Sequence, residues 1–139
     1  MKPAVPFLIA ALSLTGCASM AQDTPSCSSK EACVVTVKVS GCSEKEIVAE
    51  PDVLKVKRGY SGDILWRISG PDKWEFAENG IAFKDEKNPE FTEKRRAARE
   101  FRWYDKNTKP GPHRYNINLK SPDGKTCSKD PTIMNGQEP

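Results

Sequence analysis

The sequence is poor in the residues on which metal and acyl-transfer chemistry depend. It contains one histidine, His113, among 139 residues. A blue-copper site needs two imidazoles and a thiolate, and a zinc site needs typically four ligands from cysteine, histidine or carboxylate. Acyl transfer needs a nucleophile beside an oriented base, and phosphate binding commonly uses a glycine-rich loop that this sequence lacks. The sequence therefore predicts no metal, no cofactor and no catalytic residue.

An excess of charge of either sign is also lacking. The chain has 22 basic and 19 acidic residues, and cleavage of a leader containing Lys2 would bring the two counts closer still. This near balance gives no electrostatic reason to expect nucleic acid as a partner. Long hydrophobic runs are rare, whereas 11 prolines and 9 glycines favour short strands joined by turns.

One apolar run does stand out, at the start of the chain. A lysine at position 2 precedes an apolar segment over residues 7–14, which is too short to cross a bilayer as a helix of about 20 residues. This arrangement is typical of a secretion signal over residues 1–16. Residues 17–32 have no apolar periodicity and are expected to form a flexible tether, which leaves residues 33–139 for a single domain.

The leader ends at residues 14–17 with the tetrapeptide Leu-Thr-Gly-Cys. This tetrapeptide resembles the lipobox of bacterial lipoproteins, in which the cysteine is acylated and becomes the first mature residue. The resemblance implies that Cys17 carries lipid, palmitate among its acyl chains, and that Ala18 and Ser19 direct the protein to the outer membrane. The alternative is an ordinary signal peptide cut after Ala18 or Ala21, with Cys17 incidental.

The five cysteines become an even number once Cys17 is assigned to lipid. Four cysteines in an exported chain predict two disulfides, because the bacterial periplasm is oxidising. They allow three connectivities, and the sequence alone does not choose among them. The favoured pairing joins Cys42 to Cys127 and Cys27 to Cys33, since closing a long loop stabilises most, by roughly 4 kcal/mol or more.

Short segments with alternating apolar residues recur through the domain at a spacing close to ten residues. In the segment 113–119, the residues expected to face inward are Tyr115, Ile117 and Leu119. About eight such strands separated by turns predict an all-β fold, an antiparallel β-sandwich or barrel. The three tryptophans, Trp66, Trp74 and Trp103, are expected to be core or half-buried side chains, and two exposed side by side would make a binding surface.

Three local patterns refine this expectation. The Asn-Gly pair at 79–80 lies between two short apolar runs and predicts a hairpin turn. The charged stretch 92–99 predicts one short helix, and residues 130–135 predict a final edge strand.

Several motifs then follow in order along residues 33–135. They are a valine-rich strand, Pro-Asp-x-Leu-x-Val, Ile-x-Trp-x-Ile, an aromatic-x-Phe run with Gly-Ile soon after, Tyr-x-Ile-x-Leu and Asp-Pro-Thr-Ile-x-Asn. This order resembles small exported bacterial domains with a cupredoxin-like or immunoglobulin-like sandwich. The resemblance implies a fold and not a reaction.

The cupredoxin-like resemblance raises copper or other metal carriage as an alternative function. Cys127 and Met134 lie downstream in the order of a thiolate and a thioether ligand. Because His113 is a lone imidazole and Cys127 is expected in a disulfide, the sandwich is expected to be metal-free. A further possibility is a hydrolase acting through carboxylates, which requires a cleft containing a carboxyl whose pKa is raised by burial.

One cluster of basic residues is prominent in the sequence: Lys94, Arg95, Arg96, Arg99 and Arg102. In a helix over 92–99, Arg95 and Arg99 would lie one turn apart on one face. Such a face could dock lipid A phosphates, peptidoglycan carboxylates or an acidic protein. The alternative, which we favour, is a solvated face whose charge is balanced by Glu90, Glu93 and Glu100.

Taken with the predicted anchor, these patterns indicate a non-enzymatic lipoprotein. It would be held in the outer membrane by Cys17, face the periplasm and present its domain to an envelope protein or a cell-wall partner.

Overall fold

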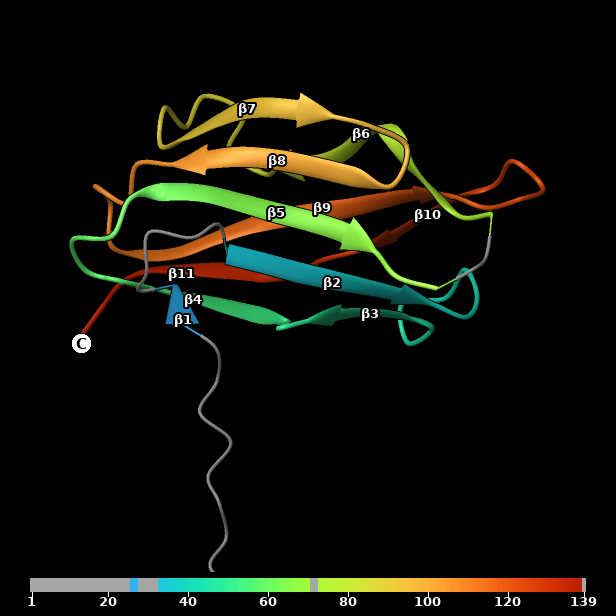
Figure 1. Ribbon diagram of the computed structural model, residues 1–139, viewed down its shortest axis with the longest axis horizontal. Helices are drawn as coiled ribbons and strands as arrows, with labels where there is room; N and C mark the ends of the chain where they lie inside the picture. The colour runs from blue at the N-terminus through green and yellow to red at the C-terminus, as the bar shows by residue number, and fades with distance from the viewer. Residues whose placement is uncertain (1–25, 28–32, 71–72, 139) are drawn as a thin grey trace, which may run out of the picture.

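A computed structural model of the chain describes residues 26–27, 33–70 and 73–138. These residues form eleven strands in two facing sheets, without a helix (Figure 1). The six-stranded sheet contains β1 (Ser26–Cys27), β4 (Val53–Lys57), β6 (Glu75–Phe83), β9 (Gly111–Lys120), β10 (Thr126–Lys129) and β11 (Thr132–Gln137). The five-stranded sheet contains β2 (Cys33–Val39), β3 (Ile47–Glu50), β5 (Gly62–Ile68), β7 (Phe91–Arg96) and β8 (Glu100–Asp105). The all-β sandwich expected from the sequence is confirmed.

Both sheets are mixed, where the sequence analysis expected antiparallel pairing throughout. β2 pairs parallel with β5, and β4 lies parallel to both β1 and β11. The chain passes from β2 and β3 in one sheet to β4 in the other and then back to β5. Because of these crossings, neighbours in a sheet are often not neighbours in sequence. Strand spacing alone therefore does not reveal strand direction.

The core lies between the sheets and is built from the alternating residues that the sequence indicated. Tyr115, Ile117 and Leu119 of β9 are all fully buried. The Trp66 ring meets the Tyr115 ring edge-on, with centroids 5.4 Å apart, and its indole N–H donates a hydrogen bond of 3.0 Å to the Tyr115 hydroxyl. Trp74 is also buried and Trp103 is half-buried, as expected for core and sheet residues.

The short helix expected over 92–99 is wrong. Residues 91–96 form the edge strand β7, which pairs antiparallel with β8 and has a bulge between Glu93 and Arg95. The helical interpretation depended on charge spacing alone. A helix here would have had no apolar face to bury, whereas a strand satisfies its backbone against β8 and lets Phe91 enter the core.

The hairpin expected at Asn79-Gly80 is also wrong. β6 runs unbroken through these residues, with a shift in its register to β9 between Phe76 and Ile81. A Cβ atom at Gly80 would lie 2.6 Å from Cβ of Phe76 and 2.7 Å from Cε2 of Phe101. The glycine therefore does not form a turn here. It lets the Phe76 and Phe101 side chains pack closely against the backbone of β6.

The sequence predicts an edge strand at residues 130–135, and this position is wrong. The last strand, β11, lies inside the six-stranded sheet. β11 pairs parallel with β4 on one side and antiparallel with β9 on the other. Its second residue, Ile133, is fully buried. The start of the sheet also differs from expectation, because β1 precedes Cys33 and pairs with β4, and Cys27 is 6 % exposed.

The two long edges of the sandwich are closed in different ways (Figure 1). On one side, β3 is the last strand of the five-stranded sheet, β1 and β4 are the outer strands of the six-stranded sheet, and both disulfides join the sheets there. We call this the bridged edge. On the other side, β7 is the last strand of one sheet and β6 pairs only with β9. We call this the open edge.

Candidate functional site

Cys17 and the leader lie outside the described residues, so acylation stays a prediction. Within the described ranges, no helix is long and apolar enough to cross a membrane.

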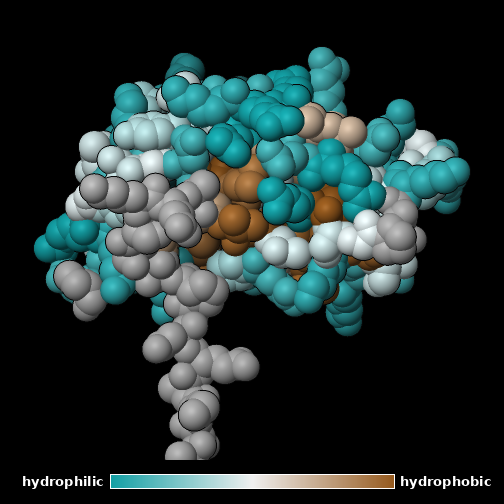
Figure 2. Space-filling view, viewed as in Figure 1, coloured by the Kyte–Doolittle hydropathy of each residue, from teal (hydrophilic) through white to brown (hydrophobic). Residues whose placement is uncertain are grey.

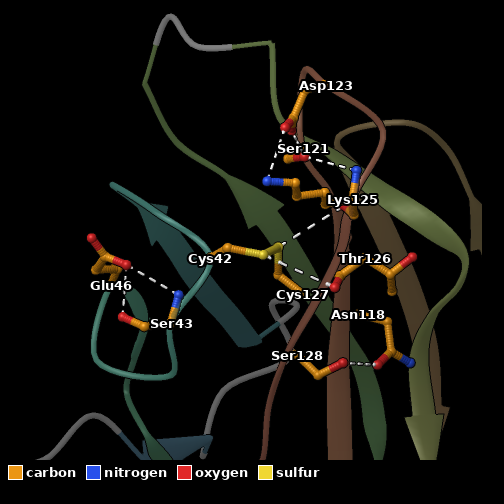
Figure 3. The surroundings of a disulfide bond; sticks show 10 residues. All are labelled: Cys42, Ser43, Glu46, Asn118, Ser121, Asp123, Lys125, Thr126, Cys127 and Ser128. Atoms are coloured by element: carbon orange, nitrogen blue, oxygen red, sulfur yellow. Dashed lines mark hydrogen bonds and ion pairs between the residues drawn. A yellow bond between two sulfur atoms is a disulfide. The ribbon is translucent and has the colours of Figure 1, made fainter.

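The four remaining cysteines form the favoured pairs, Cys27–Cys33 and Cys42–Cys127. Cys42 belongs to the turn between β2 and β3, and Cys127 is a buried residue of β10 (Figure 3). The turn is held by the Glu46 carboxylate, which accepts hydrogen bonds from the Ser43 backbone N–H (3.0 Å) and hydroxyl (2.7 Å). Each disulfide thus ties a residue of the five-stranded sheet or its turns to the six-stranded sheet.

The three candidate copper ligands do not meet. Leu119 lies opposite Cys127, so His113 is six residues away along β9, about 20 Å at the rise of an antiparallel strand. Ile133 is the partner of His113 in the register of β11, which directs Met134 to the opposite face of the sheet. No group of three or more His, Cys, Asp or Glu placed to hold a metal occurs in the described part of the chain. These residues do not fit a copper site.

Protein groups already occupy both ring nitrogens of His113. Its Nε2 lies 2.9 Å from the Lys109 carbonyl, and its Nδ1 lies 3.1 Å from Nδ2 of Asn88. The Asn88 side-chain oxygen accepts the Glu90 backbone N–H, so its amide NH₂ is left to donate to His113. This arrangement assigns the ring proton to Nε2. His113 therefore joins the loop between β8 and β9 to the segment before β7.

The predicted basic cluster is divided among separate partners. Arg95 pairs with Glu100 at 3.3 Å, Arg96 with Glu93 at 3.1 Å and Arg102 with Asp63 at 3.7 Å. Arg99 donates to the Gly70 carbonyl at 2.6 Å, and the Lys94 ammonium lies over the Tyr104 ring. Arg95 lies opposite Arg102 in the register of β7 and β8, whereas Arg96 lies opposite the core residue Phe101. This arrangement favours a solvated, charge-balanced face over an anionic dock.

The outer face of the five-stranded sheet also exposes apolar surface. Figure 2 shows this surface over β2 and β5, with hydrophilic side chains around it. Val34, which is 44 % exposed, lies opposite Leu65 in the register of these two strands.

Two buried carboxylates lie at one end of the sandwich, and the sequence analysis did not single them out as a pair. Glu90 is 1 % exposed and accepts hydrogen bonds from the backbone N–H of Thr108, the Thr108 hydroxyl (2.7 Å) and the backbone N–H of Lys109 (3.1 Å). Burial raises the pKa of Glu90, but these bonds outweigh it and hold the pKa below its usual value. Glu90 thereby fixes the loop between β8 and β9.

Asp105 is the second buried carboxylate and is also 1 % exposed. Burial raises the pKa of Asp105 to about 6, against hydrogen bonds from the Asn107 N–H (2.8 Å) and the Asn135 amide (3.0 Å). One side-chain oxygen of Asp105 and that of Asn135 are buried without a hydrogen-bond partner. The raised pKa is one of the two features expected of a carboxylate hydrolase. The other feature is a cleft, and Asp105 lines neither of the two hollows described below.

Asn107 completes this cluster. Its amide donates to the carbonyls of Lys57 and Tyr60, both at 2.7 Å, and its side-chain oxygen accepts the Gly136 N–H. The spacing Asp-x-Asn at 105–107 is a sequence signal for an Asx-turn that could have found part of the cluster. No comparable local signal marks Glu90.

A hollow of about 480 Å³ opens beside this loop. We call it the end hollow. Three basic side chains and one acidic side chain, Asp85, line it. Its walls also include Phe83, Pro110 and the His113 ring. The basic residues are Lys84, Lys109 and Arg114. The Lys84 ammonium pairs with Asp130 at 2.9 Å.

A second hollow, of about 280 Å³, lies at the open edge, and we call it the edge hollow. Its residues come from β6, β7, β8 and the segment between β6 and β7, and it shares Phe83, Asp85 and Asn88 with the end hollow. Five apolar side chains line it: Ile81, Ala82, Phe83, Phe91 and Trp103. The open edge thus carries an aromatic depression where the bridged edge carries disulfides.

Comparison with known proteins places this chain in no family, since no family model and no curated protein matches the sequence.

Proposed function

We propose that this protein is an exported lipoprotein, held in the outer membrane by acylated Cys17 and facing the periplasm, that acts by binding. The leader and the Leu-Thr-Gly-Cys sequence before the domain support the anchor. The two disulfides support an oxidising compartment, because bridges of this kind are rare where thiols are kept reduced. In keeping with the resemblance stated above, we class the domain as a metal-free, cupredoxin-like sandwich.

The single observation that carries the proposal is where the anchor joins the fold. Ser26, in β1 on the bridged edge, follows Cys17 by nine residues, a reach of at most about 30 Å. The open edge and its hollow lie across the full width of the sheet, beyond β4, β11 and β9. An anchor at Cys17 would therefore keep the bridged edge within about 30 Å of the bilayer and leave the open edge accessible to an envelope protein or a cell-wall component.

Binding rather than catalysis is supported by the use that the fold makes of its ionisable groups. Glu90 and His113 both hold the loop between β8 and β9, and Asp105 holds the turn at Asn107. Each of these side chains is held by hydrogen bonds within the protein, and His113, the one that lines the end hollow, has both ring nitrogens engaged by Lys109 and Asn88.

The anchor is tested with Cys17→Ser in the full-length chain. We expect loss of acylation and release from the membrane fraction, measured by mass spectrometry of the N-terminus and by fractionation. Ala18→Asp serves as the matched variant, because it keeps Cys17 and is expected to leave the protein acylated but retained in the inner membrane. An unacylated wild-type N-terminus beginning after Ala18 or Ala21 would contradict the proposal.

A further inference from the structure

The floor of the edge hollow is a corner of three aromatic rings. The Phe83 and Phe91 rings are stacked, with centroids 3.9 Å apart, and the Trp103 ring stands at 68° to Phe83 with centroids 5.1 Å apart. The three rings come from three strands, β6, β7 and β8, which fixes their arrangement. Phe83 and Phe91 are mostly buried, whereas Trp103 is half-buried and lines the hollow.

The rim of the edge hollow is acidic. Three carboxylates and one guanidinium line it: Asp85, Glu86, Glu93 and Arg96. The Arg96 guanidinium is bound to Glu93 through two hydrogen bonds of 3.1 and 3.2 Å and lies 3.9 Å from Glu78. Within the described residues, neither Asp85 nor Glu86 forms an ion pair. Two of the carboxylates that line the hollow are therefore available to a cationic ligand.

Resting on the proposed binding function, we propose that the edge hollow binds a small organic cation with an apolar body, of the alkylated ammonium type. Such a cation is attracted to the negative faces of aromatic rings, and its methyl groups bury well against them. The carboxylates add charge complementarity at the mouth. The volume of about 280 Å³ suits a head group rather than a large ligand.

The end hollow provides an internal contrast. It shares Phe83, Asp85 and Asn88 with the edge hollow, but three of its lining side chains are basic and it lacks Glu86, Glu93 and Trp103. A neutral apolar ligand would not distinguish the two hollows by charge, whereas a cation favours the edge hollow alone. The choice of ligand class therefore depends on the rim and not only on the apolar floor.

The test compares choline with 3,3-dimethylbutan-1-ol, which has the same shape but no charge. Both are titrated into the full-length protein, purified in a non-ionic detergent from whichever fraction contains it, while tryptophan emission is followed. We expect a saturable change with choline and at least fivefold weaker binding of the alcohol. The change should be absent in Trp103→Phe, because Trp66 and Trp74 are buried away from the hollow.

Charge at the rim is tested with the double variant Asp85→Asn/Glu86→Gln. Both side chains are exposed, so the fold should tolerate the change, and we expect choline binding to weaken at least fivefold. Glu44→Gln/Glu75→Gln removes the same charge from exposed sites outside the hollow and should leave binding unchanged.

Three outcomes would overturn the inference: no saturable response to choline, equal affinity for the neutral alcohol, or a response that persists in Trp103→Phe. The result is separable from that for the anchor. A protein that is acylated at Cys17 but does not bind choline would refute the ligand and leave the anchor standing. A protein that binds choline but is not acylated at Cys17 would refute the anchor and leave the ligand standing.

Discussion

The bridged edge and the open edge close the same sandwich by different physical means. At the bridged edge, Cys27–Cys33 and Cys42–Cys127 each connect one sheet to the other, and β1 extends the sheet beyond β4. At the open edge, the sheets meet through side chains, among them the edge-on pair Phe76 and Phe101, with centroids 5.0 Å apart. One backbone hydrogen bond also crosses there, from the Phe76 N–H to the Ala98 carbonyl at 2.6 Å.

This difference shows how a small domain can keep a hollow at its surface without losing its fold. Covalent bonds at one edge restrict the unfolded chain and so stabilise the whole sandwich, wherever they are placed. The opposite edge is then free to leave aromatic side chains partly exposed. The disulfides and the aromatic hollow thus lie at different edges of the sandwich.

The largest expected effect comes from removing the longer bridge. Cys42→Ala/Cys127→Ala opens a loop with a sequence separation of 85, which on the chain-entropy estimate lowers the free energy of unfolding by about 4–5 kcal/mol. Cys27→Ala/Cys33→Ala, with a separation of 6, should cost only about 2 kcal/mol. Urea unfolding followed by tryptophan fluorescence measures both. An equal or larger loss from the short bridge would break the comparison.

The next largest effect on stability is expected from Asp105, at the end of the sandwich. The pKa of Asp105 is about 6 in the fold against an ordinary 3.8, so the folded protein binds this proton more tightly than the unfolded chain does. The contribution of this group to stability is therefore complete below about pH 4 and is lost as the pH rises through 6. Asp105→Asn should remove that loss and stabilise the protein at neutral pH by up to about 3 kcal/mol.

Glu90→Gln is the opposite control for Asp105→Asn. Because the pKa of Glu90 is lowered, its contribution is present above its ordinary pKa of 4.5 and is lost as the pH falls. The variant should therefore destabilise the protein at neutral pH. Urea unfolding curves measured from pH 4 to 7 check both predicted changes in stability, the gain in Asp105→Asn and the loss in Glu90→Gln. A wild-type protein whose stability rises steadily from pH 4 to 7 would contradict the role given to Asp105.

A smaller effect is expected from Gly80→Ala at the open edge. The added methyl group would press on Phe76 and Phe101, and overpacking of this kind costs about 2 kcal/mol. Combining it with Phe101→Leu should cost less than the sum of the two changes, because the second relieves the clash. Gly59→Ala, at a position with φ of +83° and open space around it, tests backbone strain without a clash. Additive losses would show that Gly80 is not required by packing.

The smallest effect is expected from Glu93→Gln at the rim of the edge hollow. Its partner Arg96 is 45 % exposed and Glu93 is 34 % exposed, so water screens the pair. We expect the unfolding midpoint to stay within error of the wild type. A clear loss of stability would mean that charge, rather than aromatic packing, closes the open edge.

Much of the bridged edge is readable in the sequence, and much of the open edge is not. Cysteine counting and an oxidising compartment predict two bridges, and loop length favours the observed pairing. The inward residues of β9 follow from strict alternation, which depends only on strand geometry. These features are local, or follow from one chemical rule.

The open edge depends instead on pairings between distant segments. The sequence of β7 predicts a helix because its charges, and not its single buried residue Phe91, dominate the local pattern. The local sequence predicts a turn at Gly80. The reason for the glycine is the close approach of Phe101, which lies 21 residues later in the chain. The hollow combines Phe83, Phe91 and Trp103, and no local signal shows that these three rings meet.

The place of β1 in the fold has a mechanical consequence if the chain is anchored through its N-terminal segment, as we propose. In a chain tethered by its N-terminal end, tension arriving at Cys27 divides between β4, its neighbour in the sheet, and the covalent bond to Cys33 at the start of β2. Both sheets are therefore pulled together from the same side. Force applied through an anchored N-terminal segment would therefore be transmitted to both sheets at the bridged edge, on the opposite side of the sandwich from the three aromatic rings.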